Sequence, residues 1–182
     1  MKKRRARALR TNLLAGLLGA TAALAASAAD TKGCAAYAVD VSQDVAAMQT
    51  PQTRVEAAAA APAALRSGTV YRLRLSPQQG FAFVAAPERR QLDEGAYAGL
   101  AQFSVPTAGR WRVNLGGASW IDIVDAEGRL LPAGRFEGHE ECAIRKWVEF
   151  PLEADVRYTL QLSGGAEAEL TVMISGPLPD AP

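Results

Sequence analysis

Histidine is almost absent from this 182-residue chain, whose only histidine is His139. One imidazole cannot supply the two histidines of a non-haem iron triad or the three of a carbonic-anhydrase-like zinc site. No serine lies in a G-x-S-x-G context, and no sequence feature pairs Ser119 with His139. The sequence therefore favours a protein that binds over one that uses a histidine-dependent catalytic site.

Acidic residues are absent before Asp30, whereas Met1–Asn12 holds six basic residues. The following segment, Leu13–Ala26, is almost entirely apolar but too short to span a bilayer as a helix. Ala26-Ser27-Ala28 matches the small-residue pattern of a signal-peptidase site. These features predict a cleaved signal peptide over residues 1–28, no transmembrane anchor in the mature chain, and a periplasmic or secreted location.

Removal of the signal peptide changes the charge balance. The mature chain keeps 20 − 6 = 14 Lys and Arg against 19 Asp and Glu, a net charge of −5. A protein with this balance lacks the basic footprint needed to bind phosphate backbones. Nucleic acid is therefore not an expected partner.

Cysteine is also scarce, with only Cys34 and Cys142 present. In an oxidising compartment, such a pair most simply forms one disulfide, here closing a loop of 142 − 34 = 108 residues. The chain-entropy relation gives such a crosslink about 4–5 kcal/mol of stabilisation. The disulfide would tie the N-terminal segment to a late loop; free thiols or a metal site are the alternatives.

Strand–helix–strand alternation is missing, which disfavours a parallel α/β fold. The stretch 109–128 instead predicts two strands, 110–115 and 119–124, joined as a hairpin by a Gly-Gly turn. In the first strand, Trp111, Val113 and Leu115 alternate with polar residues and are predicted to face a core. Similar short runs recur as far as residue 174, so we expect an all-β, antiparallel β-sandwich or jelly roll of about 8–10 short strands.

The expected order along the chain is a signal peptide (1–28), an N-terminal helix with an alanine-rich segment (29–67), the β-sandwich (68–176) and a disordered tail (177–182). The one short helix is predicted to open at a capping box formed by Asp40 and Gln43. The alanine-rich part has two interpretations, an edge strand near Val55 or a loose linker.

Two tryptophans and an acidic turn make the candidate binding surface. Trp120 and Trp147 alternate with acidic residues in predicted strands, so both are expected on a solvent face that an envelope glycan or protein could contact. The acidic members are Asp122, Asp125 and Glu127. Packing of either tryptophan into the core or under the N-terminal helix is the alternative.

Metal binding has two weak candidate sites. Asp122, Asp125 and Glu127 offer oxygens to calcium, although their spacing is not that of an EF-hand. His139 and Glu140 offer a second pair next to Cys142. The alternatives are an ordinary turn, in which Asp125 accepts backbone hydrogen bonds and Gly128 adopts positive φ, and a solvated acidic loop. No cofactor is otherwise expected.

Arg145-Lys146 forms a small basic pair that could attract an anionic ligand, with Arg110 and Arg112 as further members. Ion pairing with neighbouring acidic residues is the interpretation that we prefer for these four side chains.

Three segments resemble a group of small exported proteobacterial proteins, some of which carry the label homogentisate 1,2-dioxygenase. They are Tyr37–Ser42 after Cys34, Trp120–Asp125, and the pattern Cys142-x-x-Arg-Lys-x-Val-x-Phe150. A single histidine does not fit the dioxygenase chemistry. More distantly, the pattern of residues 69–174 is similar to pre-peptidase C-terminal domains, jelly-roll-like modules accessory to secreted enzymes.

The sequence as a whole predicts a non-catalytic exported β-sandwich that acts as a binding or accessory module in the cell envelope. A metal-binding protein or metal-dependent enzyme using surface carboxylates is one alternative. A structural envelope component is the other.

Overall fold

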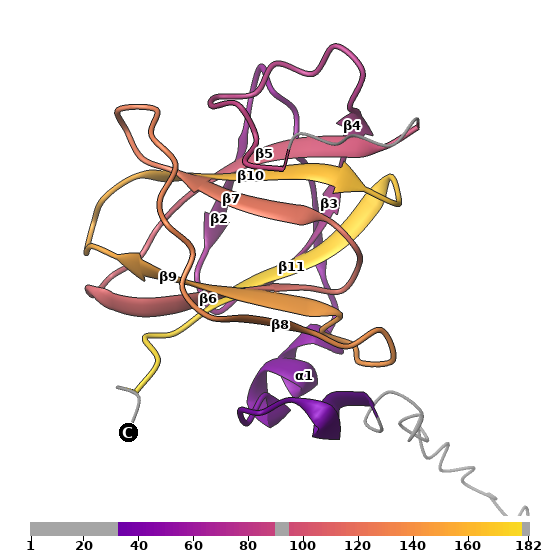
Figure 1. Cartoon of the computed structure of the whole chain (residues 1–182), viewed down its shortest axis with the longest axis vertical. Helices are drawn as coiled ribbons and strands as arrows, with labels where there is room; N and C mark the ends of the chain where they lie inside the picture. The colour runs from indigo at the N-terminus through magenta and orange to yellow at the C-terminus, as the bar shows by residue number, and fades with distance from the viewer. Residues whose placement is uncertain (1–32, 90–94, 180–182) are drawn as a thin grey trace, which may run out of the picture.

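Two stacked β-sheets form the body of the protein in the computed structural model, which describes residues 33–89 and 95–179 (Figure 1). The predicted signal peptide lies outside these ranges. The six-stranded sheet has the order β1 (Thr53–Glu56), β3 (Val70–Arg74), β11 (Glu169–Ser175), β6 (Gly109–Leu115), β9 (Lys146–Leu152), β8 (Phe136–Gly138). The five-stranded sheet has the order β2 (Ala63–Arg66), β5 (Tyr97–Ser104), β10 (Tyr158–Gly165), β7 (Trp120–Val124), with β4 (Ser76–Pro77) paired to β5. The fold is a β-sandwich, as predicted.

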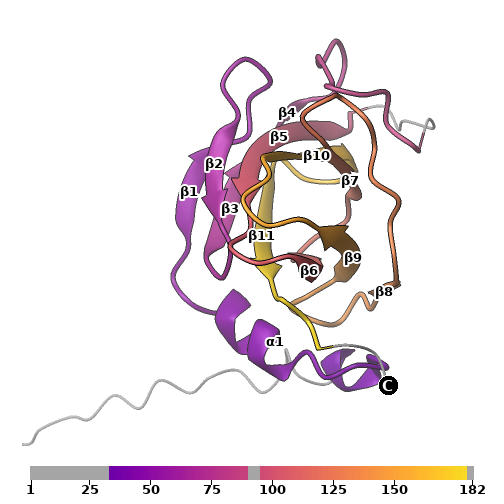
Figure 2. The same ribbon diagram turned by 90° about the vertical axis from the view of Figure 1, so that its left-hand side faces the viewer.

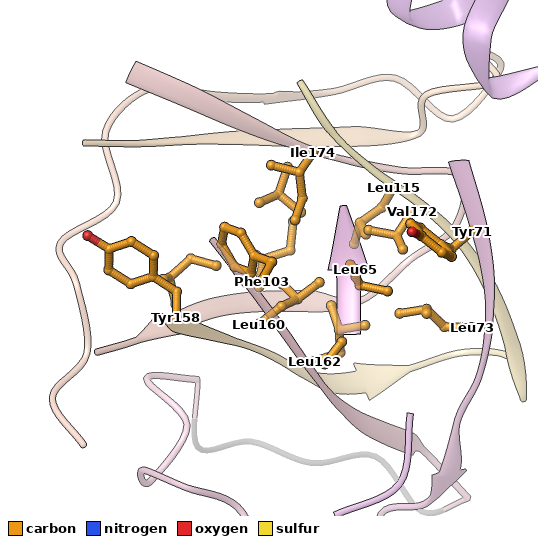
Figure 3. Packing of buried hydrophobic residues seen from close by; sticks show 14 of the residues in the cluster. Leu65, Tyr71, Leu73, Phe103, Leu115, Tyr158, Leu160, Leu162, Val172 and Ile174 are labelled. Carbon is orange, nitrogen blue, oxygen red and sulfur yellow. The ribbon is translucent and has the colours of Figure 1, made fainter. Parts of the chain in front are cut away.

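The main core lies between the sheets, because each central strand turns alternate apolar side chains inward. Figure 3 shows Leu115, Val172 and Ile174 of the six-stranded sheet on one side of this core and Leu160 and Leu162 of β10 on the other. The predicted inward face of β6 is confirmed: its three apolar residues, Trp111, Val113 and Leu115, are all buried.

The predicted hairpin at Gly116-Gly117 is wrong. β6 pairs with β9 and β11, whereas β7 pairs with β10 in the opposite sheet. The two glycines therefore carry the chain from one sheet to the other. A side chain at Gly117 would place its Cβ 2.8 Å from Leu170 Cδ1, so a larger residue there would require the Leu170 side chain to move. Turn-forming residues mark a change of direction but do not say which sheet the next strand joins.

Consecutive strands alternate between the sheets throughout, apart from the β4–β5 and β8–β9 pairs. As a result, β1 and β2 lie along one side of the sandwich and β7 and β8 along the other (Figure 2). The β7–β8 side is important below, because both are edge strands. The end of β7 also pairs with the returning chain, where the Leu131 amide donates to the Ile123 carbonyl at 2.8 Å.

The alanine-rich segment is part of the sandwich and not a linker. β1 pairs in parallel with β3, and β2 pairs in parallel with β5. Both sheets are therefore mixed, whereas the prediction was wholly antiparallel, and the sandwich begins well before residue 68. Short alanine-rich strands carry little periodic signal, since only Leu65 of β2 is a large buried side chain.

One short helix, α1 (Ser42–Met48), lies on the outer face of the six-stranded sheet after a 3₁₀ turn, η2 (Gly33–Ala36). The predicted capping box is wrong: Asp40 Oδ1 accepts a hydrogen bond from the Ser42 amide (2.9 Å), and the N-cap residue is Val41. Val45 and Met48 pack against Val70 and Met173 in a second hydrophobic cluster. The predicted disulfide between Cys34 and Cys142 is confirmed and fastens this segment to the sandwich.

The start of the predicted disordered tail is attached to β6. The Leu178 amide donates to the Arg110 carbonyl (2.8 Å), and the Arg110 guanidinium donates to the Pro179 carbonyl. Residues 180–182 lie outside the described ranges. Within the described ranges, no helix combines the length and apolar character needed to cross a membrane.

Candidate functional site: a cleft between two edge strands

A cleft of about 420 Å³ opens on the side of the sandwich where edge strands β7 and β8 lie. Its size falls within the range of about 300–1,000 Å³ typical of small-molecule sites. One wall comes from the start of β7 and the end of β10, and the other from β8 and the loop that leads into β9. Its charged and aromatic lining residues are Arg89, Trp120, Phe136, Glu137, His139, Glu140, Arg145 and Lys146.

Lys146 bridges the two walls of the cleft. It is the first residue of β9 and lies on the inward side with Val148, at the point where the apolar core ends. Its Nζ reaches the other sheet, 4.6 Å from the centre of the Trp120 ring and 3.5 Å from the Ser119 carbonyl oxygen. The resulting cation–π contact holds the ammonium group in the cleft.

Lys146 and Arg89 are cations without a carboxylate partner: among residues 33–89 and 95–179, none lies within ion-pair distance of either. Burial lowers the pKa of Lys146, and repulsion from Arg89 lowers it further, while attraction to Asp122 opposes both. The ion pairing expected from sequence for Lys146 is therefore not observed. Arg145 does pair, with Glu140 at 2.9 Å.

The acidic residues of the opposite wall are occupied by local partners. His139 Nε2 lies 3.0 Å from Glu137 Oε1, and the Glu137 carboxylate also accepts from the Ala38 amide at 3.2 Å. The hydrogen bond from His139 is the main cause that lowers the pKa of Glu137. His139 and Glu140, which were predicted as a possible pair of metal ligands, therefore have different partners: His139 contacts Glu137, and Glu140 pairs with Arg145. Sequence reasoning included Glu137 only among the acids of residues 137–141 as possible metal ligands, and it did not indicate the contacts of Glu137 with His139 and Ala38.

The N-terminal segment supports this wall from behind. The Tyr37 hydroxyl donates to the Ile144 carbonyl (2.5 Å), and its ring meets the His139 ring edge-on at 4.5 Å between centroids. The disulfide joins Cys34 to Cys142 in the same loop. The shape of the cleft therefore depends on the tethered N-terminal segment, although that segment contributes no lining residue.

Trp147 is not on the surface, contrary to the predicted solvent face. It is only 1% exposed, packed on the outer face of the six-stranded sheet beneath the N-terminal segment. The alternating pattern correctly places Trp147 on the outer face of β9, but α1 and Tyr37 cover that face and exclude solvent. Arg112 stacks on the Trp147 ring at 4.5 Å and, with Arg110, pairs with Glu149, so these two arginines belong to a different cluster from Lys146.

Asp122 is also buried, not exposed as predicted. It accepts hydrogen bonds from Trp120 Nε1 (2.9 Å), Gln161 Nε2 (3.4 Å) and the Glu88 amide (3.4 Å). The loop 81–89 covers this outer face of the five-stranded sheet, and the Val84 amide donates to Gln161 at 3.0 Å. Burial raises the pKa of Asp122, and these hydrogen bonds only partly offset the rise.

Asp122 should make stability depend on pH in the sense opposite to most carboxylates. A raised pKa means that the folded state binds the proton more tightly, so the contribution is complete below the ordinary value of 3.8 and is lost as pH rises through the folded pKa. The unfolding free energy of wild type minus that of Asp122→Asn is therefore expected to fall between acidic and neutral pH, measured by urea denaturation.

Asp40→Asn is the matched control, because Asp40 is exposed and hydrogen bonds from Ser42 lower its pKa. Its contribution is present above pH 3.8 and is lost as pH falls, so the same difference should rise with pH. A difference for Asp122→Asn that does not vary with pH would contradict the inferred burial effect.

Asp125 and Glu127 form an ordinary turn. Asp125 Oδ1 accepts from the amides of Glu127 (3.0 Å) and Arg129 (2.8 Å), and Gly128 has φ 80°. Arg129 pairs with both carboxylates. In the described parts of the chain, no group of three or more His, Cys, Asp or Glu side chains converges as metal ligands would. Of the five predicted surface residues, only Trp120 lines the cleft.

Ser119 and His139 both line the cleft, yet they are not joined as nucleophile and base. Ser119 Oγ donates to the Ser163 carbonyl (3.0 Å), while the bonded nitrogen of His139 faces Glu137.

No family model and no curated protein sequence matches this chain. Its class therefore rests on structure: a two-sheet β-sandwich with a disulfide-tethered N-terminal helix and an aromatic, basic cleft at one open edge.

Proposed function

We propose that this protein is a non-catalytic, exported binding module that holds a saccharide of the cell envelope in the β7–β8 cleft. The observation that carries the proposal is Phe136, which is 70% exposed at the cleft and is not needed by the core. A large exposed aromatic beside a concave polar site is suited to pack against the C–H face of a sugar ring. Cleft hydroxyl, carboxylate and guanidinium groups can bind the sugar hydroxyls.

Export is supported by two independent sequence features. The first 28 residues have the charge, length and cleavage pattern of a signal peptide, and a disulfide persists mainly in oxidising compartments. The proposed absence of catalysis is supported by pairing inside the cleft, where His139 binds Glu137, Arg145 binds Glu140, and Ser119 binds a carbonyl.

A saccharide is favoured over an envelope protein by the nature of the surface. A stable protein interface buries about 800 Å² on each partner around an apolar centre. Across the described residues, the exposed large apolar side chains are Val84, Leu130 and Phe136, and only Phe136 belongs to the cleft. A small concave site with one aromatic contact fits one or two sugar rings better.

Replacing Phe136 with alanine should weaken saccharide binding by about tenfold, which corresponds to loss of a contact worth about 1.4 kcal/mol. Because Phe136 is exposed, the substitution should leave the melting temperature nearly unchanged. Binding would be found on an array of bacterial-envelope and plant saccharides and quantified by calorimetry.

Leu130→Ala is the matched control, since Leu130 is also an exposed apolar residue but lies outside the cleft. It should bind as wild type does. Equal affinities for Phe136→Ala and wild type would place the binding site elsewhere, and an array without any bound saccharide would refute the proposed function.

A further inference from the structure

The cleft holds more positive charge than its own side chains neutralise. Glu137 is engaged by His139 and the Ala38 amide, and Glu140 by Arg145. Lys146 and Arg89 remain, both line the cleft, and repulsion from Arg89 contributes to lowering the pKa of Lys146. This local excess stands out on a chain whose mature net charge is negative.

We infer that the ligand is an acidic saccharide whose carboxylate is bound by Lys146 and Arg89, while its ring packs on Phe136. This inference rests on the proposed function and names the ligand class of the same site. An anion between the two cations would relieve their repulsion and restore a counter-charge to the half-buried ammonium group.

Lys146 is already held in position for this role. Its ammonium is fixed over Trp120, and Trp120 is fixed in turn by its hydrogen bond to the buried Asp122. Its only hydrogen-bond acceptor among the described residues is the Ser119 carbonyl, at a long 3.5 Å. A ligand carboxylate can therefore take up the remaining N–H donors without breaking a strong contact.

The lining also distinguishes a sugar carboxylate from a phosphate. Typical phosphate sites present several backbone amides from a helix N-terminus or a glycine-rich nest. The cleft is bordered by β7, β8, β9 and β10 and their loops, and neither η2 nor α1 contributes a lining residue. Two cationic side chains with an aromatic platform suit a carboxylate carried on a ring.

The test compares acidic saccharides with their neutral counterparts on the mature protein. An array carrying uronate and sialic-acid saccharides beside neutral ones is the first step, and oligogalacturonate against its methyl ester gives a matched pair for titration. We expect acidic members to bind at least about tenfold more tightly than neutral ones. This preference should shrink as salt is raised.

The variants are Lys146→Met and Arg89→Gln, with Arg54→Gln on the opposite edge strand, β1, as a control that removes the same charge. Lys146→Met should abolish the preference for acidic saccharides, and Arg89→Gln should reduce it. Arg54→Gln should retain the preference. Lys146→Arg, which keeps the charge, should retain most of it even where Lys146→Met alters folding.

Three outcomes separate the two proposals. If the array binds neutral saccharides as well as acidic ones and Lys146→Met has no effect, the acidic ligand is refuted while saccharide binding stands. If no saccharide binds, both proposals fail. If inorganic phosphate displaces the bound acid at an equal concentration, the site recognises a bare anion and the inference is overturned.

Discussion

Loss of the Cys34–Cys142 disulfide is expected to lower the free energy of unfolding by about 4–5 kcal/mol. The bond closes a loop with a sequence separation of 108 residues, so the reduced unfolded chain gains much conformational freedom. Because a domain of this size is stable by only about 5–15 kcal/mol, such a loss is a large part of the total. Urea denaturation of the oxidised protein and of the double variant Cys34→Ala, Cys142→Ala measures it.

Tyr37→Phe is the control for the local contacts of the same segment. It removes only the hydrogen bond to the Ile144 carbonyl and keeps the crosslink, so it should cost about 1–3 kcal/mol. If the cysteine double variant were no less stable than Tyr37→Phe, the crosslink would contribute little beyond the packing that it accompanies.

Removal of the Glu149 side chain is expected to cost about 3–5 kcal/mol, because it leaves a buried positive charge without its main partner. Glu149 Oε1 accepts from Arg112 at 2.9 Å, and its other oxygen accepts from Arg110 at 3.1 Å. Arg112 is only 4% exposed and lies between α1 and the sheet. The variant Glu149→Leu, of similar volume, isolates loss of the charge from loss of packing.

A double variant separates the two explanations of that cost. Replacing Arg112 and Glu149 together by leucine removes both buried charges, so it should be less destabilising than Glu149→Leu alone. Glu56→Gln, which breaks the exposed pair between Glu56 and Arg74, should cost no more than about 1 kcal/mol. A double variant at least as damaging as the single one would show that packing, and not an unpaired charge, dominates.

This buried cluster also explains why Trp147 was misplaced from the sequence. Alternation in β9 sends Trp147 and Glu149 to the same side of the strand, which is the outer face of the sheet. An outer face with a glutamate normally faces solvent. Here α1 covers it, and the charge is matched by Arg110 and Arg112 from β6. Such coverage depends on contacts between distant segments, which local periodicity does not report.

In the candidate site, too, local sequence indicated single residues, whereas contacts between distant segments decided which of them lie together. Trp120 was chosen from its alternation, and Arg145-Lys146 was noted as a possible anion site from sequence. Their association depends on Lys146 crossing from one sheet to a residue of the other. Phe136 lies in a three-residue strand with no periodic signal, so no pattern could indicate it before the edge of the sandwich was known.

The sequence alone determined the features set by short-range physics. Alternation of apolar residues fixes which face of each strand is buried, as at Trp111 and Val113, because successive side chains point to opposite sides. Two cysteines, behind an N-terminal segment with the pattern of a signal peptide, predicted the disulfide that the structure contains. The β-sandwich class followed from many short alternating segments and the lack of helical periodicity.

The tertiary structure decided which strands are neighbours and what covers each outer face. Gly116-Gly117 joins strands of different sheets because pairing energy depends on partners far along the chain, not on the turn residues. The same contacts between distant segments bury Asp122 under the loop 81–89 and leave β7 and β8 as edge strands on the same side of the sandwich. The cleft results from that topology, and its lining residues come from segments that are far apart in the sequence.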